Sequence, residues 1–208
     1  MEVKQQILHK AGELFMRYGI KSVSMDDLAR ELGISKKTLY QYVENKADLI
    51  QQIFQEKIEL EKQIMKEIRL SSVDAIDEIL KIARYVTEEL RQISPTTMYD
   101  LQKYYREVWK EMEALHKRHV YMLIRDNLER GVKQGFYREN MNPDIVAKLY
   151  VGKTSLVVDE DLFPTRDYDK SELFKEYIRY HINGVASPKG LKLLVQHLGK
   201  EQDQLKII

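Results

Sequence analysis

The stretch from residue 22 to residue 49, SVSMDDLARELGISKKTLYQYVENKADL, constrains the fold more than any other part of the chain. Ser24 followed by Asp27 is typical of a capping box at the start of a helix. Apolar residues then follow at the spacing of one helical face, namely Met25, Leu28, Ala29 and Leu32. Gly33 predicts the end of this short helix, because glycine readily takes the left-handed conformation found at helix C-termini.

A second short helix is predicted from Lys36 to about Val43, with Ser35 as its cap. Leu39 and Val43 can face the core, and the remaining side chains form a polar face: Lys36, Lys37, Thr38, Tyr40, Gln41 and Tyr42. Asn45 can cap a third helix. Two short helices, a glycine turn and a polar-faced second helix predict a helix-turn-helix, the motif that places its second helix in the DNA major groove.

The polar face has the chemistry of a DNA-contacting surface. Lysines supply a sequence-independent attraction to phosphates, and hydroxyl groups fix the register on the backbone. Tyr40 and Gln41 could reach base edges, with glutamine suited to adenine. Lys46 adds a charge in the first turn of the next helix, where free amides favour a phosphate. The candidate DNA-binding residues are Ser24, Ser35, Lys36, Lys37, Thr38, Tyr40, Gln41, Tyr42 and Lys46.

The run SMDDLARELGISKKTLYQYVENKADL resembles the DNA-binding signature of the TetR family of bacterial transcriptional regulators. The matching features are the small residue and acid before the first short helix, the A-x-x-x-G-I/V-S turn and the T-L-Y-x-Y-F-x-x-K-x-x-L run. The dense match extends from Ile7 to Phe54, and Val43 stands where the family usually has phenylalanine. Elsewhere the chain matches only in length and helical rhythm.

The resemblance implies roles for individual residues. Thr38 and Tyr42 would hold phosphates, Tyr40 would lie at the groove, and Lys46 would anchor the DNA backbone. It also implies a sequence-specific transcriptional regulator that acts as a homodimer on a near-palindromic operator. Repression, relieved by a small ligand, is the default expectation, although nothing in the sequence separates a repressor from an activator.

Composition limits the other possibilities. The chain has 208 residues, 43% of them hydrophobic and 32% charged, with few glycines and prolines, as suits a globular helical protein. It has no cysteine, no apolar run near the roughly 18 residues of a membrane span, and no signal-peptide core. We therefore expect a cytoplasmic protein without disulfides, bound cofactor or membrane association. The net charge of the whole chain is +1, and residues 1–50 carry eight basic and seven acidic side chains, which is also +1. DNA affinity must therefore come from the local placement of basic residues. The near balance of charge also favours two copies of the protein acting together.

Helical periodicity covers the rest of the chain. Helices are predicted over residues 3–18, 46–70, 74–93, 95–108, 111–134, 143–158 and 169–185, with a short amphipathic tail helix after residue 190. The boundary between the helices at 95–108 and 111–134 stays open. The prediction is an all-α protein of about nine or ten helices. Residues 1–46 would form the helix-turn-helix DNA-binding domain, and residues 47–208 a helical bundle for ligand binding and dimerisation.

The helices at 143–158 and 169–185 are candidates for the dimer surface, because they are more apolar than one packed face requires. The candidate interface residues are Leu149, Gly152, Leu156, Phe174, Tyr177, Ile178 and Ile182. The alternative is that these are ordinary core helices of one protomer. In the family that the chain resembles, the last two long helices form a four-helix dimer interface.

Aromatic residues and methionines gather between residues 98 and 122. Such side chains line many small-molecule sites, and the candidate pocket residues are Met98, Tyr99, Tyr105, Trp109, Met112, Tyr121 and Met122. The alternative is again ordinary helix core. An apolar or aromatic effector bound here would have to bind two arrangements of the protein with different affinity to change DNA binding.

Two other classes of function compete with the regulator. Glu113 and His116 form an E-x-x-H, half of the motif that builds di-iron sites in helical bundles, but no second E-x-x-H is present. A metal-dependent enzyme is therefore the weakest hypothesis, and no metal site is expected. A helical interaction protein, in which the helix-turn-helix is only a packing motif, predicts no salt-sensitive DNA binding.

Overall fold

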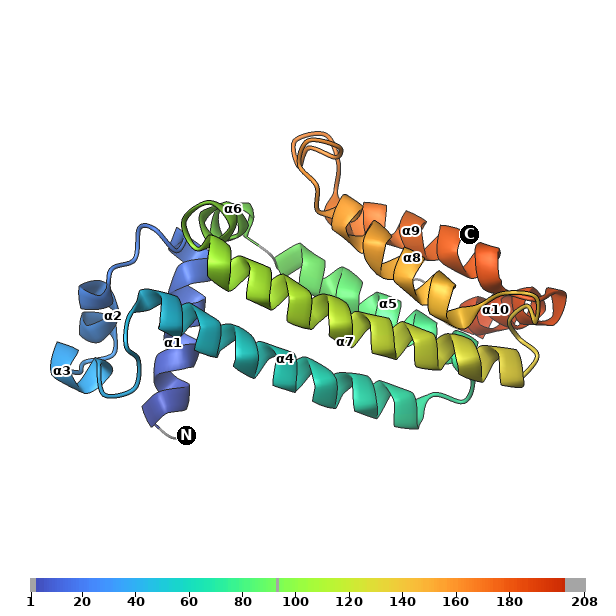
Figure 1. The fold of residues 1–208 in the computed structure, drawn as a ribbon, viewed down its shortest axis with the longest axis horizontal. Coiled ribbons are helices and arrows are strands. Elements are labelled where there is room, and N and C mark those ends of the chain that lie inside the picture. Colours follow the sequence, from blue (N-terminus) through green and yellow to red (C-terminus); the bar gives the residue numbers. More distant parts are fainter. Residues whose placement is uncertain (1–2, 93, 201–208) are drawn as a thin grey trace. The chain divides into compact units, whose positions relative to one another are not determined.

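The computed structural model of the protein describes residues 3–92 and 94–200, which form ten helices and no strand. The all-α prediction is confirmed (Figure 1). The helices are α1 (Val3–Tyr18), α2 (Met25–Glu31), α3 (Lys36–Leu39), α4 (Lys46–Ser71), α5 (Ala75–Gln92), α6 (Pro95–Tyr104), α7 (Arg106–Lys133), α8 (Pro143–Val157), α9 (Lys170–Val185) and α10 (Pro188–Lys200). None of the helices in the described ranges is long and apolar enough to cross a membrane.

Several helix ends lie at residues of a type that favours capping. Gly19 follows α1 with a φ of 82°, Asn142 accepts backbone N–H groups at the start of α8, and Asp169 does so at the start of α9. The open boundary between α6 and α7 lies at Tyr105, whose φ of −127° and ψ of 47° are not helical. Helix α7 therefore begins at Arg106, five residues before the predicted start at 111.

The helices group into two compact units. Unit 1 contains the described residues up to Gln63 and those from Ser94 to His116, and unit 2 contains Ile64–Gln92 and the described residues from Lys117 onward. This grouping does not coincide with a division at residue 46, because Leu101 of α6 and Met112 of α7 are buried in the same core as α1 and α2. The division into a DNA-binding and a ligand-binding domain at that residue stays a prediction.

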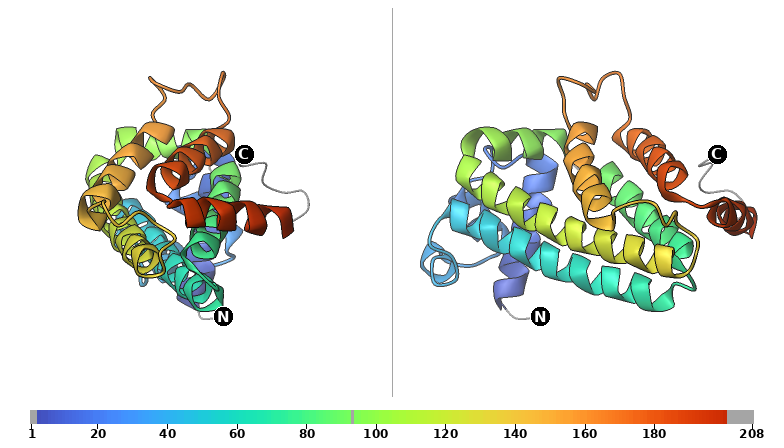
Figure 2. Two further views of the ribbon diagram at one scale, coloured as in Figure 1. Left: turned by 90° about the vertical axis from the view of Figure 1, so that its right-hand side faces the viewer. Right: turned by 45° about the vertical axis from the view of Figure 1, so that its right-hand side comes forward.

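Unit 2 is built around α5. Its apolar stripe is almost fully buried and consists of Ala75, Ile76, Ile79, Leu80, Ile82 and Ala83. Helices α9 and α10 pack against α5, and α8 lies beside α9 (Figure 2). A regular 3.6-residue stripe of this kind drives burial of one helix face against its neighbours.

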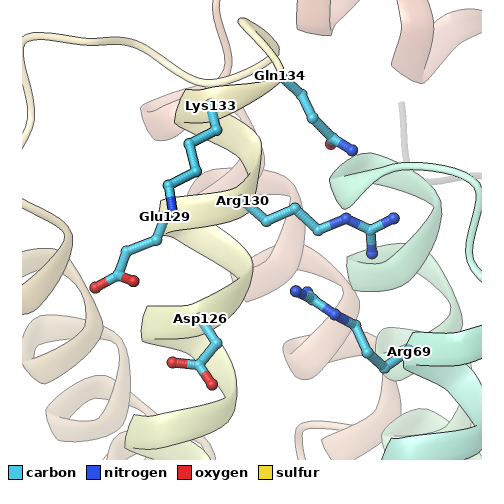
Figure 3. A pocket seen from close by; sticks show the side chains of 6 residues that line it. All are labelled: Arg69, Asp126, Glu129, Arg130, Lys133 and Gln134. Atoms are coloured by element: carbon cyan, nitrogen blue, oxygen red, sulfur yellow. The ribbon is translucent and has the colours of Figure 1, made fainter.

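A buried carboxylate joins three elements of unit 2. The Glu78 residue is 1% exposed, and its Oε2 accepts hydrogen bonds from Arg69 at 2.6 Å, Arg130 at 3.2 Å and Asn127 at 2.9 Å. Both guanidinium groups extend from facing helices into the same space (Figure 3). Burial of a charge is tolerated only with such partners, so this cluster ties α4 and α7 to α5. Burial, together with the charge of Glu78, also raises the pKa of Tyr137, whose hydroxyl contacts Asn127.

Candidate DNA-binding surface

Local hydrogen bonds form α2 in the way its sequence predicts. The side chain of Ser24 accepts the backbone N–H of Asp27 at 3.1 Å, and the Asp27 carboxylate accepts the backbone N–H of Ser24 at 3.0 Å. The predicted capping box is therefore confirmed. Hydrogen bonds from the Ser24 hydroxyl and amide hold the pKa of Asp27 below its usual value. Gly33 has a φ of 65°, the left-handed conformation that ends the helix.

Helix α3 is shorter than predicted. Its α-helical part ends at Leu39, and the chain continues in turns closed by i→i+3 bonds, from the N–H of Gln41 to the carbonyl of Thr38 and from Tyr42 to Leu39. Such bonds tighten the last turn of a helix. The tightened turns still bring Val43 into the core, so the prediction that Leu39 and Val43 face inward is confirmed.

The opposite side of α3 is an uncovered polar surface. Lys36, Lys37, Gln41 and Ser35 are exposed, and Tyr40 is 48% exposed. Thr38 and Tyr42 are half-buried beside them. This surface, which we call the α3 face, consists of Ser35, Lys36, Lys37, Thr38, Tyr40, Gln41 and Tyr42.

One lysine of the α3 face has an acidic neighbour within unit 1. The Lys36 ammonium lies 2.5 Å from a carboxylate oxygen of Asp26, and both side chains are more than half exposed. Exposed ion pairs of this kind contribute little stability. A phosphate could therefore take the place of the carboxylate at small cost.

Lys46 is arranged differently from the other candidate residues. Its ammonium donates to the backbone carbonyl oxygens of Ile20 and Val23 and lies 5.6 Å from the centre of the Phe15 ring. Burial lowers its pKa, and the charges of Asp100 and Asp27 oppose that effect. Lys46 thus holds the loop between α1 and α2. A contact of Lys46 with the DNA backbone stays a prediction.

Comparison with known proteins identifies the family. The family model described as "Bacterial regulatory proteins, tetR family" matches residues 7–53, which include α2, α3 and their caps. The chain belongs to the TetR family of bacterial transcriptional regulators. This TetR-family protein is a DNA-binding transcriptional regulator, and its curated relatives are regulators, a class without enzymatic activity.

The similarity extends beyond the matched region. The HTH-type transcriptional regulator YvaF of Bacillus subtilis, itself uncharacterized, is 24% identical over 184 residues, which cover 88% of this chain and 95% of YvaF. A TetR-family regulator from Agrobacterium tumefaciens has the same fold, with a TM-score of 0.68 at 17% identity over 88% of this chain and 97% of that one. The ketosteroid transcriptional regulator KstR2 of Mycobacterium tuberculosis matches with a TM-score of 0.55 at 15% identity, over 89% of this chain and 96% of KstR2.

The predicted pocket residues of this TetR-family regulator are divided between the two units. Met98, Tyr99, Tyr105, Trp109 and Met112 belong to unit 1, where Met112 is buried in the core and Tyr105 and Trp109 pack against it. In unit 2, the Tyr121 hydroxyl donates to the Asp144 carboxylate at 2.6 Å, and Met122 is exposed. Met112 therefore fits the alternative given above, that it is an ordinary core residue and does not line a pocket.

Two surface cavities lie elsewhere. A cavity of about 440 Å³ in unit 2 is lined by Arg69, Asp126, Glu129, Arg130, Lys133 and Gln134 (Figure 3). One of about 480 Å³ in unit 1 is lined by Lys10, Glu13, Leu14, Met16 and Arg17. Both linings are mostly charged, whereas sites for drug-sized ligands are mostly apolar. Neither cavity suits the apolar effector that the sequence suggests.

The predicted interface residues also separate into two groups. Leu149, Gly152 and Leu156 on α8 are exposed. On α9, Phe174, Ile178 and Ile182 are buried in the core of their own protomer, and Tyr177 is half-buried. The interface prediction is therefore wrong for Phe174, Ile178 and Ile182, because the side of α9 that carries them packs against α5.

The E-x-x-H of α7 is not part of a larger ligand cluster in the described ranges. Glu113 is half-buried, and His116 lies 4.0 Å from a carboxylate oxygen of Glu61. Among the residues that the structure describes, no group of three or more His, Asp or Glu side chains could hold a metal ion.

Proposed function

We propose that this TetR-family regulator is a homodimeric repressor that binds a near-palindromic operator through the α3 face and responds to a small effector. One observation carries the DNA-binding part of the proposal. The polar side of α3 is uncovered within unit 1, while Leu39 and Val43 fix its other side in the core. A helix held in this way can enter a major groove without rearrangement of its own packing.

The α3 face would divide its contacts between the DNA backbone and the bases. Lys36 and Lys37 would neutralise phosphates, and the Thr38 and Tyr42 hydroxyls would fix the register on the backbone. Tyr40 and Gln41, which are exposed, would contact base edges. One copy offers only two lysines on this face, so two copies on a two-fold axis would be needed for tight binding.

A stripe on α8 supports a homodimer. Ile145, Leu149, Gly152 and Leu156 follow the i, i+4, i+7, i+11 spacing of one helix face, and all four are exposed. Gly152 has no side chain to hold a second helix away, and the space beside it is open within the protomer, since a Cβ there would have no neighbour within 4 Å. Exposed apolar stripes of this kind are typical of association surfaces. Tyr180 on α9, which is also exposed, would add an aromatic edge.

An effector of apolar or aromatic chemistry remains part of the proposal, but its site is not assigned. The name of KstR2 concerns ketosteroids, which are apolar molecules of the kind we expect. In this chain such an effector would bind the DNA-competent and DNA-incompetent arrangements with different affinity. Without effector, the dimer would block the promoter.

Selection of operator sequences from random duplex DNA tests the proposal. Lys37→Ala and Tyr40→Ala remove side chains of the α3 face, and Lys66→Ala on α4 is a matched control because Lys66 is an exposed lysine of unit 2. We expect an enriched near-palindrome, at least about tenfold weaker binding for the first two variants, and a Lys66→Ala affinity within about twofold of wild type. Because the proposed dimer carries Lys37 twice, Lys37→Ala removes two phosphate contacts and should also reduce the steepness of log K against log salt by about 1.8, which is about 0.9 for each contact.

Absence of any enriched sequence at low salt would contradict the proposal. So would equal losses for Lys37→Ala and Lys66→Ala, because the contact would then not lie on α3. An enriched site without two-fold symmetry would be consistent with DNA binding through the α3 face but would contradict binding as a homodimer.

A further inference from the structure

The short loop between α1 and α2 is held by two other helices of unit 1. On one side, Lys46 at the start of α4 donates to the carbonyl oxygens of Ile20 and Val23. On the other side, the Asp100 carboxylate of α6 accepts the backbone N–H of Lys21 at 2.7 Å. Side chains from α4 and α6 therefore occupy two carbonyl groups and one amide of the same loop.

Helix α6 approaches this loop very closely. Gly19 has a φ of 82°, and a Cβ there would lie 2.9 Å from Cγ2 of Thr96 and 3.1 Å from the Asp100 carboxylate. Next to it, the Thr97 hydroxyl donates to the carbonyl of Phe15 at 2.5 Å. The α6 residues thus dock on the last turn of α1 and on the first residue of the loop.

Asp100 is buried, and Lys46 feels its charge. Asp100 is 6% exposed, and a carboxylate buried to that degree needs both a hydrogen-bond donor and a positive charge nearby. The Lys21 amide supplies the donor. Lys46 lies within electrostatic reach, because the charge of Asp100 is the largest influence that opposes the lowering of the Lys46 pKa by burial.

The loop in turn fixes the start of α2. Val23, whose carbonyl Lys46 holds, directly precedes Ser24, the capping residue of α2. Leu28 and Ala29 then seat α2 in the core, and α2 packs on α3. A displacement of the loop would therefore move α2 and the α3 face with it.

We propose that Asp100 is a positioning residue for DNA binding, which sets the orientation of α2 and α3 by holding the Lys21 amide. Asp100 is buried and does not touch DNA itself. The inference rests on the proposed role of the α3 face. In this proposal Asp100 of α6, which is 79 positions from Lys21 in the sequence, helps to orient the α3 face.

Variants at one position separate positioning from simple stability. Asp100→Ala removes the acceptor, Asp100→Asn keeps a carbonyl oxygen that can accept the Lys21 N–H, and Gln102→Ala is a control at an exposed position of α6. Operator affinity would be measured by fluorescence anisotropy at one salt concentration, and exchange of the Lys21 amide by NMR.

We expect Asp100→Ala to bind the selected operator at least about tenfold more weakly and to exchange the Lys21 amide faster. Asp100→Asn should stay within about threefold of wild type with the amide protected, and Gln102→Ala within about twofold. If folded Asp100→Ala and Asp100→Asn have equal melting temperatures, a role of Asp100 in stability alone cannot explain this ranking of operator affinities.

A folded Asp100→Ala variant with wild-type affinity would overturn the inference. If Asp100→Ala does not fold, Thr97→Val is the deciding variant. An operator affinity at least threefold weaker than wild type supports positioning of the α1–α2 loop by α6, and wild-type affinity overturns the inference. Failure of the wild-type protein to select any operator would contradict the proposed function instead, so the two failures are distinguishable.

Discussion

The α3 face and the α8–α9 pair show two different relations between sequence and exposure. On α3 the apolar residues, Leu39 and Val43, are buried and the polar residues are exposed, so composition alone separates the two sides. On α8 and α9 apolar residues occur on both sides. Ile178 of α9 is 0% exposed and Leu149 of α8 is 55% exposed, although both are long aliphatic side chains. An amphipathic pattern identifies a surface only where the helix has a polar side.

The largest effect is expected on the buried side of α9. Ile178→Ala should lower the free energy of unfolding by roughly 2–5 kcal/mol, because truncation of a fully buried aliphatic side chain leaves a cavity. Urea unfolding followed by circular dichroism measures the change. A loss below about 0.5 kcal/mol would mean that Ile178 is not packed against α5 and would restore it to the predicted interface.

A pH-dependent effect of comparable size is expected at His181, also on α9. Burial, with the charge of Lys153 as a second cause, lowers the pKa of His181 from 6.5 to about 4, and its ring packs on Tyr150. A histidine whose folded pKa is depressed favours the neutral form, so its stabilising contribution is present above pH 6.5 and is lost as the pH falls toward 4. The loss at pH 4 relative to pH 7.5 is about 3 kcal/mol by linkage.

The control for His181 is the His181→Phe variant, which keeps an aromatic ring and cannot be protonated. Carboxylates also titrate in this range, so the quantity to compare is the difference in unfolding free energy between wild type and variant at each pH. That difference should change between pH 6.5 and pH 4. A constant difference would show that His181 is solvated or already paired.

A smaller effect should distinguish two lysines of unit 1. Lys46→Ala removes a half-buried ammonium from the Ile20 and Val23 carbonyls and should cost about 1.5–3 kcal/mol of stability, the range for hydrogen bonds to charged groups. Lys37→Ala should change stability by less than about 0.5 kcal/mol, because Lys37 is exposed, while weakening operator binding. Thermal melts and anisotropy on both variants test the contrast. Equal stability of the two variants would remove the structural role of Lys46.

The smallest change in protomer stability is expected at Leu149. Leu149→Ala should alter the unfolding free energy of the dilute protomer by no more than about 0.5 kcal/mol, because the side chain is already exposed. It should nevertheless raise the dissociation constant of the dimer, as measured by analytical ultracentrifugation. Leu60→Ala, at an equally exposed leucine of α4 in unit 1, is the control. If both variants dimerise like wild type, the α8 stripe is not the interface.

The parts of the fold that the sequence predicts depend on short-range contacts. Ser24 and Asp27 bond to each other, and Gly33 takes its left-handed conformation, within one or two turns of chain. Exposure along the α3 face also follows from local periodicity. These features can be predicted because the residues that interact lie close together in the sequence.

Contacts between distant residues could not be predicted in this way. The side of α9 that is buried is decided by α5, about 100 residues earlier, so periodicity could not separate Ile178 from Leu149. The carbonyl partners of Lys46 lie 23 and 26 residues away, and Asp100 meets Lys21 across 79 residues. An isolated aspartate in a predicted helix gives no sign that it is buried, so Asp100 was missed.

Hydroxyl-radical footprinting of the wild-type protein on its selected operator examines both regions at once. The α3 face and a two-fold axis through α8 predict two protected segments related by symmetry, with centres roughly 34–36 Å apart along the DNA. Both segments should weaken together in Leu149→Ala, and both should be lost in Lys37→Ala when the protein concentration is close to the wild-type dissociation constant. A single protected segment, or two segments that survive Lys37→Ala, would contradict recognition by a pair of α3 helices.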